Sequence, residues 1–378
     1  MSINVSKLSS IEEIIRQRMS EGYVPGASAA VWVDGECVYE TYAGIAKHDG
    51  TPIGPETIFR LASMTKPFTA VAVMQQVEAG RLGLFDKIED YIPELADLRV
   101  ADKDETGAVI GSHPVPRPVT LIDCLTHSSG IACGKTQELV YPNVRIRPGE
   151  TLADCVPRYK DILLDFDPGT KQFYSPIAAP DICARIVEIL SGETIDEYFK
   201  NHITDPLGMT DTVFALSEEQ RSRLAEGFNR EGETCVPAHM SESGIFNDLP
   251  ALYSGGGGLF GTLNDYCLFA NALATGGQGI LTPESIGELR TPRLSPPIAG
   301  VGRGFNWGLL VRYCAHTSRY QPLPPGCWGW SGAFGTHFFI DPTRHACAVL
   351  FSNSLAARGS DSITCRDLER CYVDALTD

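Results

Sequence analysis

The order of apolar and polar positions near the N-terminus predicts a helix followed by a β-hairpin. The helix is expected over 11–20, and the strand-like runs 27–33 and 36–42 meet at Asp34-Gly35. An Asp-Gly pair between two such runs is a strong signal for a two-residue hairpin turn. The chain is therefore predicted to open as helix, strand, strand.

A second pair of strands is predicted near the C-terminus, over 337–340 and 346–351, before a helix over 362–376. Between the two ends, from about residue 84 to 250, helices and long Pro/Gly loops predominate. This distribution predicts an α+β fold in which an antiparallel sheet from both chain ends is flanked by helices. Residues 1–83 and 251–378 would form the sheet domain, and 84–250 an inserted, mainly helical domain, with a cleft between them.

Several segments of the middle region carry no periodic pattern. The stretches 101–118 and 134–151 are predicted to be long loops, which in compact chains are commonly functional or mobile. The glycine run 254–258 is not followed by Gly-Lys-Ser/Thr, so a phosphate-binding loop is disfavoured. Thr262 and Asp265 instead have the spacing of a capping box that opens a helix over 266–273, and a structural loop is predicted.

Composition and charge narrow the class of partner. The 378 residues are 43% hydrophobic, enough for a sizeable core and two lobes. The formal charge of −16 disfavours nucleic acid and anionic membranes as partners, because both are polyanions. No apolar run is long enough to span a bilayer, and residues 1–7 lack a signal-peptide profile, so a cytoplasmic location is expected.

The twelve cysteines are scattered singly, without a C-x-x-C pair, which favours buried free thiols over a disulfide framework. The nearest approach to a metal cluster is Cys124, His127 and Cys133. Their spacing matches no common zinc pattern, and neither a metal nor a cofactor is predicted.

Ser63 and Lys66 carry the clearest chemical signal. A helix is predicted over 64–79, ending before Gly80, with Pro67 in its first turn where a missing N–H costs nothing. Residues three apart share a helix face, so the Lys66 amine can reach the Ser63 hydroxyl. The spacing alone is common, but here it falls at a helix N-terminus, where free N–H groups surround the oxygen.

Beyond this pair, the chain from about 24 to 353 resembles the serine β-lactamase-like superfamily, in the branch of class C β-lactamases, D-peptidases and family VIII carboxylesterases. The motifs that carry the resemblance are FRLASMTK (59–66), LTHSSG (125–130), DPGT (167–170), FYS (173–175), DPLGM (205–209) and WSGA (330–333). The resemblance implies a β-lactamase or penicillin-binding-protein type of fold and acylation of Ser63.

The resemblance also implies a catalytic tyrosine from a Tyr-x-Asn motif. Tyr141 stands in a literal match, whereas Tyr174 is followed by Ser175 and Pro176. The Pro-Gly-Thr loop before Tyr174 and the Pro-Leu-Gly-Met segment after it favour Tyr174. A lysine that acts as a base near neutrality needs its pKa lowered by roughly 3 units. Which of Lys66 and Tyr174 takes the Ser63 proton stays open at this point.

By resemblance, the oxyanion would be held by the N–H groups of Ser63 and Ala333, the latter from an edge strand that includes Trp330, Ser331 and Gly332. Gly332 is expected to be glycine because backbone approaches substrate there. These residues and His337, which opens the next strand, are the candidate substrate contacts. His127 is assigned to a structural loop.

Two departures from the family pattern bear on the substrate. Trp330-Ser331-Gly332 stands where β-lactamases carry Lys-Thr-Gly, and Pro176 where they carry asparagine. The first change removes a cation and the second an amide, so an uncharged ester fits better. The sequence predicts a carboxylesterase for small or medium neutral esters. A β-lactamase or D-peptidase/amidase, an acyltransferase to an alcohol, and a non-catalytic ligand-sensing module remain alternatives, and the oligomeric state is open.

Overall fold

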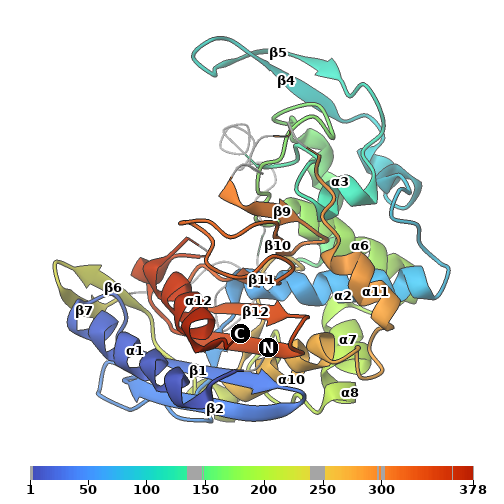
Figure 1. Ribbon diagram of the computed structural model, residues 1–378. Helices are drawn as coiled ribbons and strands as arrows, with labels where there is room; N and C mark the ends of the chain where they lie inside the picture. The colour runs from blue at the N-terminus through green and yellow to red at the C-terminus, as the bar shows by residue number, and fades with distance from the viewer. Residues whose placement is uncertain are drawn as a thin grey trace.

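A seven-stranded antiparallel sheet lies at the centre of the computed structural model, in the order β2-β1-β13-β12-β11-β10-β9 (Figure 1). Residues 3–133, 147, 149–238, 252–295, 298, 303–359 and 361–377 are described. The strands are β1 (Gly26–Val33), β2 (Glu36–Gly44), β9 (Phe305–Trp307), β10 (Arg312–Cys314), β11 (Trp328–Ser331), β12 (His337–Asp341) and β13 (Ala346–Phe351). Because β1 pairs with β13, the two chain ends share one sheet, and the predicted α+β class is confirmed.

Helices cover both faces of this sheet (Figure 1). The terminal helices α1 (Ser10–Ser20) and α12 (Ile363–Ala375) pack together on one face, and α10 (Leu263–Ala274) packs on the other. Successive side chains of a strand point to opposite faces. Accordingly, Ala29 and Val31 of β1 belong to the core under α1 and α12, whereas Ala30 belongs to the core on the other side.

The helical region is built around α2 (Lys66–Glu78), which packs against α6 (Ala178–Ser191). Ten of the thirteen residues of α2 are buried, so this helix runs through the core. The remaining helices are α3 (Leu121–Leu125), α5 (Leu152–Cys155), α7 (Ile195–Phe199), α8 (Asp205–Leu207), α9 (Glu218–Ser222) and α11 (Pro283–Arg290).

The prediction of a patternless loop over 101–118 is wrong. The hairpin β4 (Arg99–Lys103) and β5 (Val109–Pro114) occupies much of it and projects from the molecule (Figure 1). Most of its residues are at least partly exposed and the register shifts at Asp102/Lys103, so it has no regular apolar face to give a period-two signal. A further hairpin, β6 (Phe228–Glu231) and β7 (Thr234–Pro237), also lies in the region expected to be helical.

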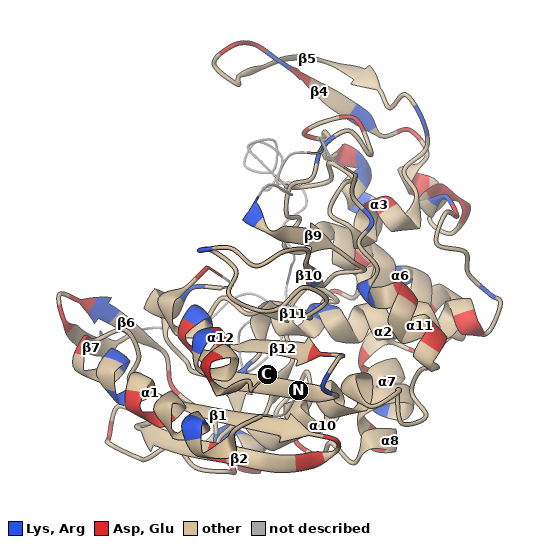
Figure 2. Ribbon diagram, viewed as in Figure 1, with Lys and Arg blue, Asp and Glu red and all other residues tan. Residues whose placement is uncertain are grey.

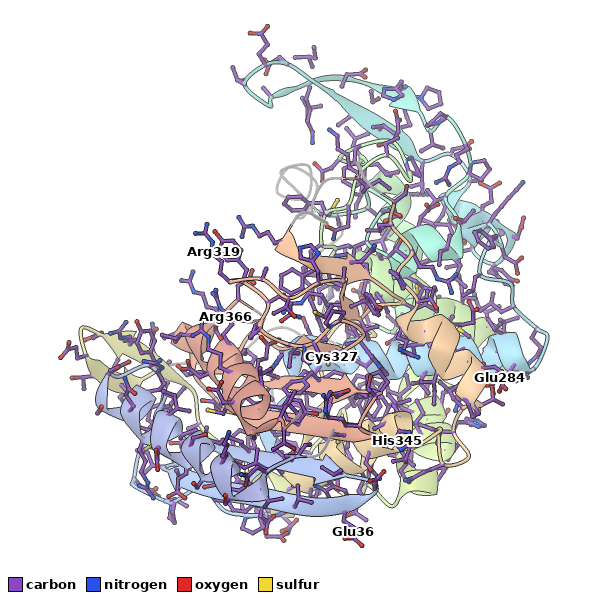
Figure 3. The ribbon with its side chains drawn as sticks, viewed as in Figure 1. Glu36, Glu284, Arg319, Cys327, His345 and Arg366 are labelled. Atoms are coloured by element: carbon purple, nitrogen blue, oxygen red, sulfur yellow. The ribbon has the colours of Figure 1, made fainter. Side chains whose placement is uncertain are left out.

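Most charged residues lie on the outer elements, with Lys66 and Asp181 among the buried exceptions, whereas the cysteines are mostly internal. Figure 2 shows acidic and basic residues spread over the outer helices and hairpins. In Figure 3, Glu36 and Glu284 lie at the edge of the molecule, whereas Cys327 lies inside, where it is 1% exposed. All twelve cysteines are free thiols, nine of them buried, as predicted. Within the described residues, no helix combines the length and the hydropathy needed to cross a bilayer.

The packing of α12 on the sheet leads to a stability prediction. Leu368 is fully buried between this helix and the sheet, so Leu368→Ala should lower the free energy of unfolding by about 2–5 kcal/mol. Arg370 on the same helix has a side chain that is 53% exposed, and Arg370→Ala should change it by at most about 0.5 kcal/mol. Urea unfolding measures both, and equal effects would contradict the described packing.

Candidate active site

Ser63 lies in a short 3-10 turn, Ala62–Thr65, that runs directly into α2. The residue before it, Ala62, has a φ of 48°, in the left-handed region that residues with a side chain seldom adopt. Such strain concentrates at functional positions, where the surrounding structure holds it. The sequence placed Ser63 at a helix N-terminus, and the structure has it there.

Lys66 is completely buried, and its amine contacts three oxygens. Nζ lies 2.6 Å from the carbonyl oxygen of Pro176, 2.5 Å from that of Gly256 and 3.2 Å from Ser63 Oγ. In a neutral amine the two N–H bonds donate to the two carbonyls, which leaves the lone pair directed at Ser63. Burial lowers the pKa of Lys66 to about 7, so the amine can accept a proton near neutrality.

The backbone of Pro176 thus takes part where the family motif has an asparagine side chain. Sequence reasoning treated Pro176 as the loss of a hydrogen-bond partner, because proline carries no side-chain donor or acceptor. Its main-chain carbonyl nevertheless accepts from Lys66. This contact was not readable from the residue type.

Tyr174 lies beside the same serine. Its hydroxyl donates to Ser63 Oγ at 2.8 Å, and Lys66 Nζ is 5.0 Å from the centre of its ring. Burial raises the pKa of Tyr174 to about 12, so this hydroxyl keeps its proton near neutrality. The competing candidate, Tyr141, lies outside the described residues.

Asp181 of α6 is a buried acid that the sequence analysis missed. It accepts hydrogen bonds from Ser254 Oγ at 2.6 Å, the Gly256 N–H at 3.3 Å and the Tyr159 hydroxyl at 3.2 Å. Burial raises the pKa of Asp181 to about 6, and its negative charge raises that of Lys66. The available signal in the sequence was an aspartate within the mostly apolar run 178–187, where a charged side chain is costly to bury.

Gly256 connects the acid with the amine, because its N–H donates to Asp181 while its carbonyl accepts from Lys66. The loop also needs glycine here, since a Cβ would come within 2.7 Å of the Pro176 carbonyl oxygen. The glycine run predicted to be merely structural therefore supplies one of the contacts of Lys66.

The segment after β11 faces Ser63 across the site. The prediction that β11 is an edge strand is wrong, since β10 and β9 extend the sheet beyond it. However, β10 pairs only with Trp328 and Gly329, so the end of β11 stays open on that side. Within the described residues, the N–H groups of Ser63 and Ala333 have no hydrogen-bond partner, which leaves both available to an oxyanion.

Gly332 is a glycine for a reason other than the expected one. A Cβ there would collide with the carbonyl oxygen of Leu61 and with Thr336 Oγ1. Thr336 also donates to the Leu61 carbonyl at 3.1 Å. Close packing of β11 against the turn that carries Ser63 imposes the glycine, rather than an approach to substrate.

A cavity of about 770 Å³ opens beside Ser63. It is lined by polar and aromatic side chains and three arginines: Ser63, Gln172, Phe173, Tyr174, Arg303, Phe305, Trp307, Arg312, Trp330, Ser331, Ala333, Arg358, Gly359 and Asp361. The ring of Trp330 lies 5.3 Å from that of Tyr174 and 4.7 Å from that of Trp307. Trp330 therefore both packs the wall and faces the cavity.

Two histidines lie behind this wall. His337 is 2% exposed, and its Nδ1 is 2.7 Å from Ser331 Oγ; it is not among the lining residues, which differs from its predicted direct contact with substrate. His127 accepts from the Ser175 N–H and packs on the ring of Tyr174. Burial and the nearby Lys66 lower the pKa of His127 well below its usual value, so the ring is neutral.

Known proteins resemble this chain in both sequence and structure. The family model described as Beta-lactamase matches residues 11–364. Protein Rv1367c of Mycobacterium tuberculosis is 31% identical over 353 residues, covering 87% of this chain and 86% of the relative. Esterase EstB of Burkholderia gladioli is 29% identical over 374 residues, covering 91% and 90%. The solved structure of EstCE1, a hydrolase with promiscuous acyltransferase activity, has a TM-score of 0.79 at 23% identity, covering 99% of each chain.

The tight approach of β11 to the Ser63 turn can be tested at Gly332. Gly332→Ala should lower the free energy of unfolding by about 1–3 kcal/mol, because the new methyl group meets backbone. Gly287 of α11 has open space at its Cβ position, and Gly287→Ala should raise stability by about 0.5–1 kcal/mol. Urea unfolding distinguishes the two, and an unperturbed Gly332→Ala would argue against the described approach.

Proposed function

The chain belongs to the beta-lactamase family, and from that premise we propose that it is a serine hydrolase acting as a carboxylesterase on small or medium neutral esters. The observation that carries the proposal is the arrangement of Lys66 and Tyr174 around Ser63. Two groups whose ordinary pKa values are alike are here separated to about 7 and about 12. This separation supports the assignment of Lys66 as base and Tyr174 as acid.

In the proposed reaction, Lys66 takes the Ser63 proton as Oγ attacks the ester carbonyl carbon. The N–H groups of Ser63 and Ala333 stabilise the negative charge on the former carbonyl oxygen. Tyr174 donates its proton to the departing alkoxide, and Lys66 returns a proton to the tyrosine. Water then attacks the acyl-enzyme by the same route, which releases the acid and restores Ser63. No metal or organic cofactor is required.

The ester preference rests on the cavity wall and on one relative. Aromatic rings of Phe173, Trp307 and Trp330 provide apolar surface next to Ser63. Of the three lining arginines, Arg312 lies 3.7 Å from Asp361, the guanidinium of Arg303 lies 5.4 Å from the centre of the Tyr320 ring, and Arg358 is exposed to solvent. EstB, an esterase by name, matches nine tenths of the chain. We propose a small-molecule ester as the partner, and neither nucleic acid nor membrane.

A substrate panel tests this proposal. Short and medium p-nitrophenyl esters should be hydrolysed with a far higher kcat/KM than nitrocefin, D-Ala-D-Ala peptides or p-nitrophenyl hydrogen succinate, which carries a carboxylate. A fluorophosphonate should label the protein once, and Ser63→Ala should abolish both labelling and turnover. The reverse substrate ranking would refute the ester preference. An adduct that survives Ser63→Ala would refute the nucleophile.

The pH dependence tests the roles of Lys66 and Asp181. Below its pKa Lys66 is an ammonium ion without a lone pair, so kcat/KM should fall as the pH drops through about 7. Asp181→Asn removes a charge that raises the pKa of Lys66, so this acid limb should move to lower pH.

The control for this shift is Asp265→Asn, which removes a carboxylate that is 4% exposed and bonded to Thr212, away from Lys66. Its loss should change stability and leave the acid limb in place. If both variants shift the limb equally, or neither does, Asp181 does not tune the amine.

A further inference from the structure

Tyr174 lies in a stretch of chain without regular secondary structure, so contacts from elsewhere must hold its hydroxyl on Ser63. Residues 171–175 form neither helix nor strand, and α6 begins only at Ala178. A group that transfers a proton must keep its position relative to the reacting atom, and a misplacement of about 1 Å can cost on the order of 100-fold in rate. The contacts that fix Tyr174 therefore bear directly on catalysis.

The chain directly after α3 runs beside the chain that leads to Tyr174. The Gly169 N–H donates to the Ser128 carbonyl oxygen at 2.8 Å. Further along, the Phe173 N–H donates to the His127 carbonyl oxygen at 3.0 Å. The second of these hydrogen bonds brings His127 next to the tyrosine.

His127 contacts each of the three residues 173–175. Its carbonyl oxygen accepts from Phe173, its Nδ1 accepts from the Ser175 N–H at 3.3 Å, and its ring lies 4.7 Å from that of Tyr174. His127 is fully buried, and its φ of 57° lies in the left-handed region. Residues with a side chain seldom adopt this backbone, and such strain clusters at functional sites.

The contacts of the His127 ring also assign its proton. An N–H group faces Nδ1, so Nδ1 keeps its lone pair and the hydrogen of the neutral ring lies on Nε2. Burial and the nearby Lys66 lower the pKa of His127 well below its usual value, which keeps the ring neutral. Within the described residues Nε2 has no hydrogen-bond partner, and Trp307 packs edge to face on the ring at 4.5 Å. The polar contact of the ring is therefore the one at Nδ1.

His127 is itself fastened to the end of α3. Its N–H donates to the Cys124 carbonyl oxygen at 3.3 Å, and the Ser128 N–H donates to that of Asp123 at 2.8 Å. The Asp123 carboxylate is buried and accepts from two guanidinium nitrogens of Arg117, at 2.6 and 2.8 Å. A bidentate pair of this kind fixes geometry strongly. These contacts restrict His127, and through it the tyrosine.

We propose that His127 is a positioning residue, whose Nδ1 and ring hold Tyr174 where its hydroxyl can protonate the departing alkoxide. The proposal rests on the proposed ester hydrolysis, in which Tyr174 is the acid. His127 is not among the residues that line the cavity, so it acts through the tyrosine. Loss of Nδ1 would leave the buried Ser175 N–H without its acceptor, which favours a displaced backbone next to Tyr174.

The leaving group of the ester tests this role. p-Nitrophenolate departs as a stable anion, whereas ethoxide must receive a proton as it leaves. His127→Ala should therefore lower kcat/KM for ethyl butanoate by on the order of 100-fold more than for p-nitrophenyl butanoate. Tyr174→Phe, which removes the acid itself, should discriminate between the two esters in the same direction and more strongly. A general folding defect would lower both values alike.

Two further variants separate the Nδ1 contact from a merely structural role. His127→Asn offers a side-chain oxygen in place of Nδ1 and tolerates a positive φ, so it should recover the ratio by about 5-fold relative to His127→Ala. His345 also has a positive φ, of 45°, but it is exposed in the turn between β12 and β13. His345→Ala is the matched control and should leave the ratio unchanged.

Equal losses on both esters in His127→Ala would overturn the positioning role and leave the esterase proposal standing. No hydrolysis of either ester by the wild-type protein would overturn both. An Asn variant no better than His127→Ala would show that Nδ1 does not hold the tyrosine. If His127→Ala does not fold, nitrogen NMR of the wild-type protein decides the assignment, because a hydrogen on Nδ1 of His127 would overturn it and an unprotonated Nδ1 would support it.

Discussion

Complete burial of the Lys66 amine is the constraint on which the rest of the site depends. An amine removed from water must find acceptors for its hydrogens, and it loses affinity for a third proton. Both acceptors are main-chain carbonyls, from the start of the segment that leads into α6 and from the glycine run before β8 (Phe260–Gly261). These two loops must therefore both contact the Lys66 amine of α2. Their carbonyl oxygens take its two hydrogens, which directs the lone pair of Nζ toward Ser63.

The second requirement is that the sheet reach the Ser63 turn. Leu61 donates its N–H to the Leu259 carbonyl and offers its own carbonyl to Thr336, so the turn is held between the short strand pair β3 (Phe59–Arg60) and β8 and the β11–β12 connection. Only a residue without a Cβ fits at Gly332 in this contact. The unpaired N–H groups of Ser63 and Ala333 thus come from segments that are fastened to each other, which pre-organises them.

Local features could be read from the sequence, and features that join distant segments could not. The Asp34-Gly35 hairpin, the terminal helices and the Ser63-Lys66 spacing involve neighbours in the chain, and the structure has each where the pattern placed it. Asp181 acquires its importance from a contact with Gly256, 75 residues away in the chain, which no periodicity of the sequence encodes. The strands β9 and β10 have three residues each, too few for an alternation, and so β11 was mistaken for an edge.

Because main-chain oxygens hold Lys66, the site tolerates substitutions at position 176, which supplies one of them. A substitution can delete a side-chain acceptor, but it cannot delete a carbonyl group of the backbone. The side chain at position 176 is therefore not needed to orient Lys66, and a proline can stand there. Mutational drift at this position can reshape the surroundings of Ser63 without uncoupling the serine from the group that activates it.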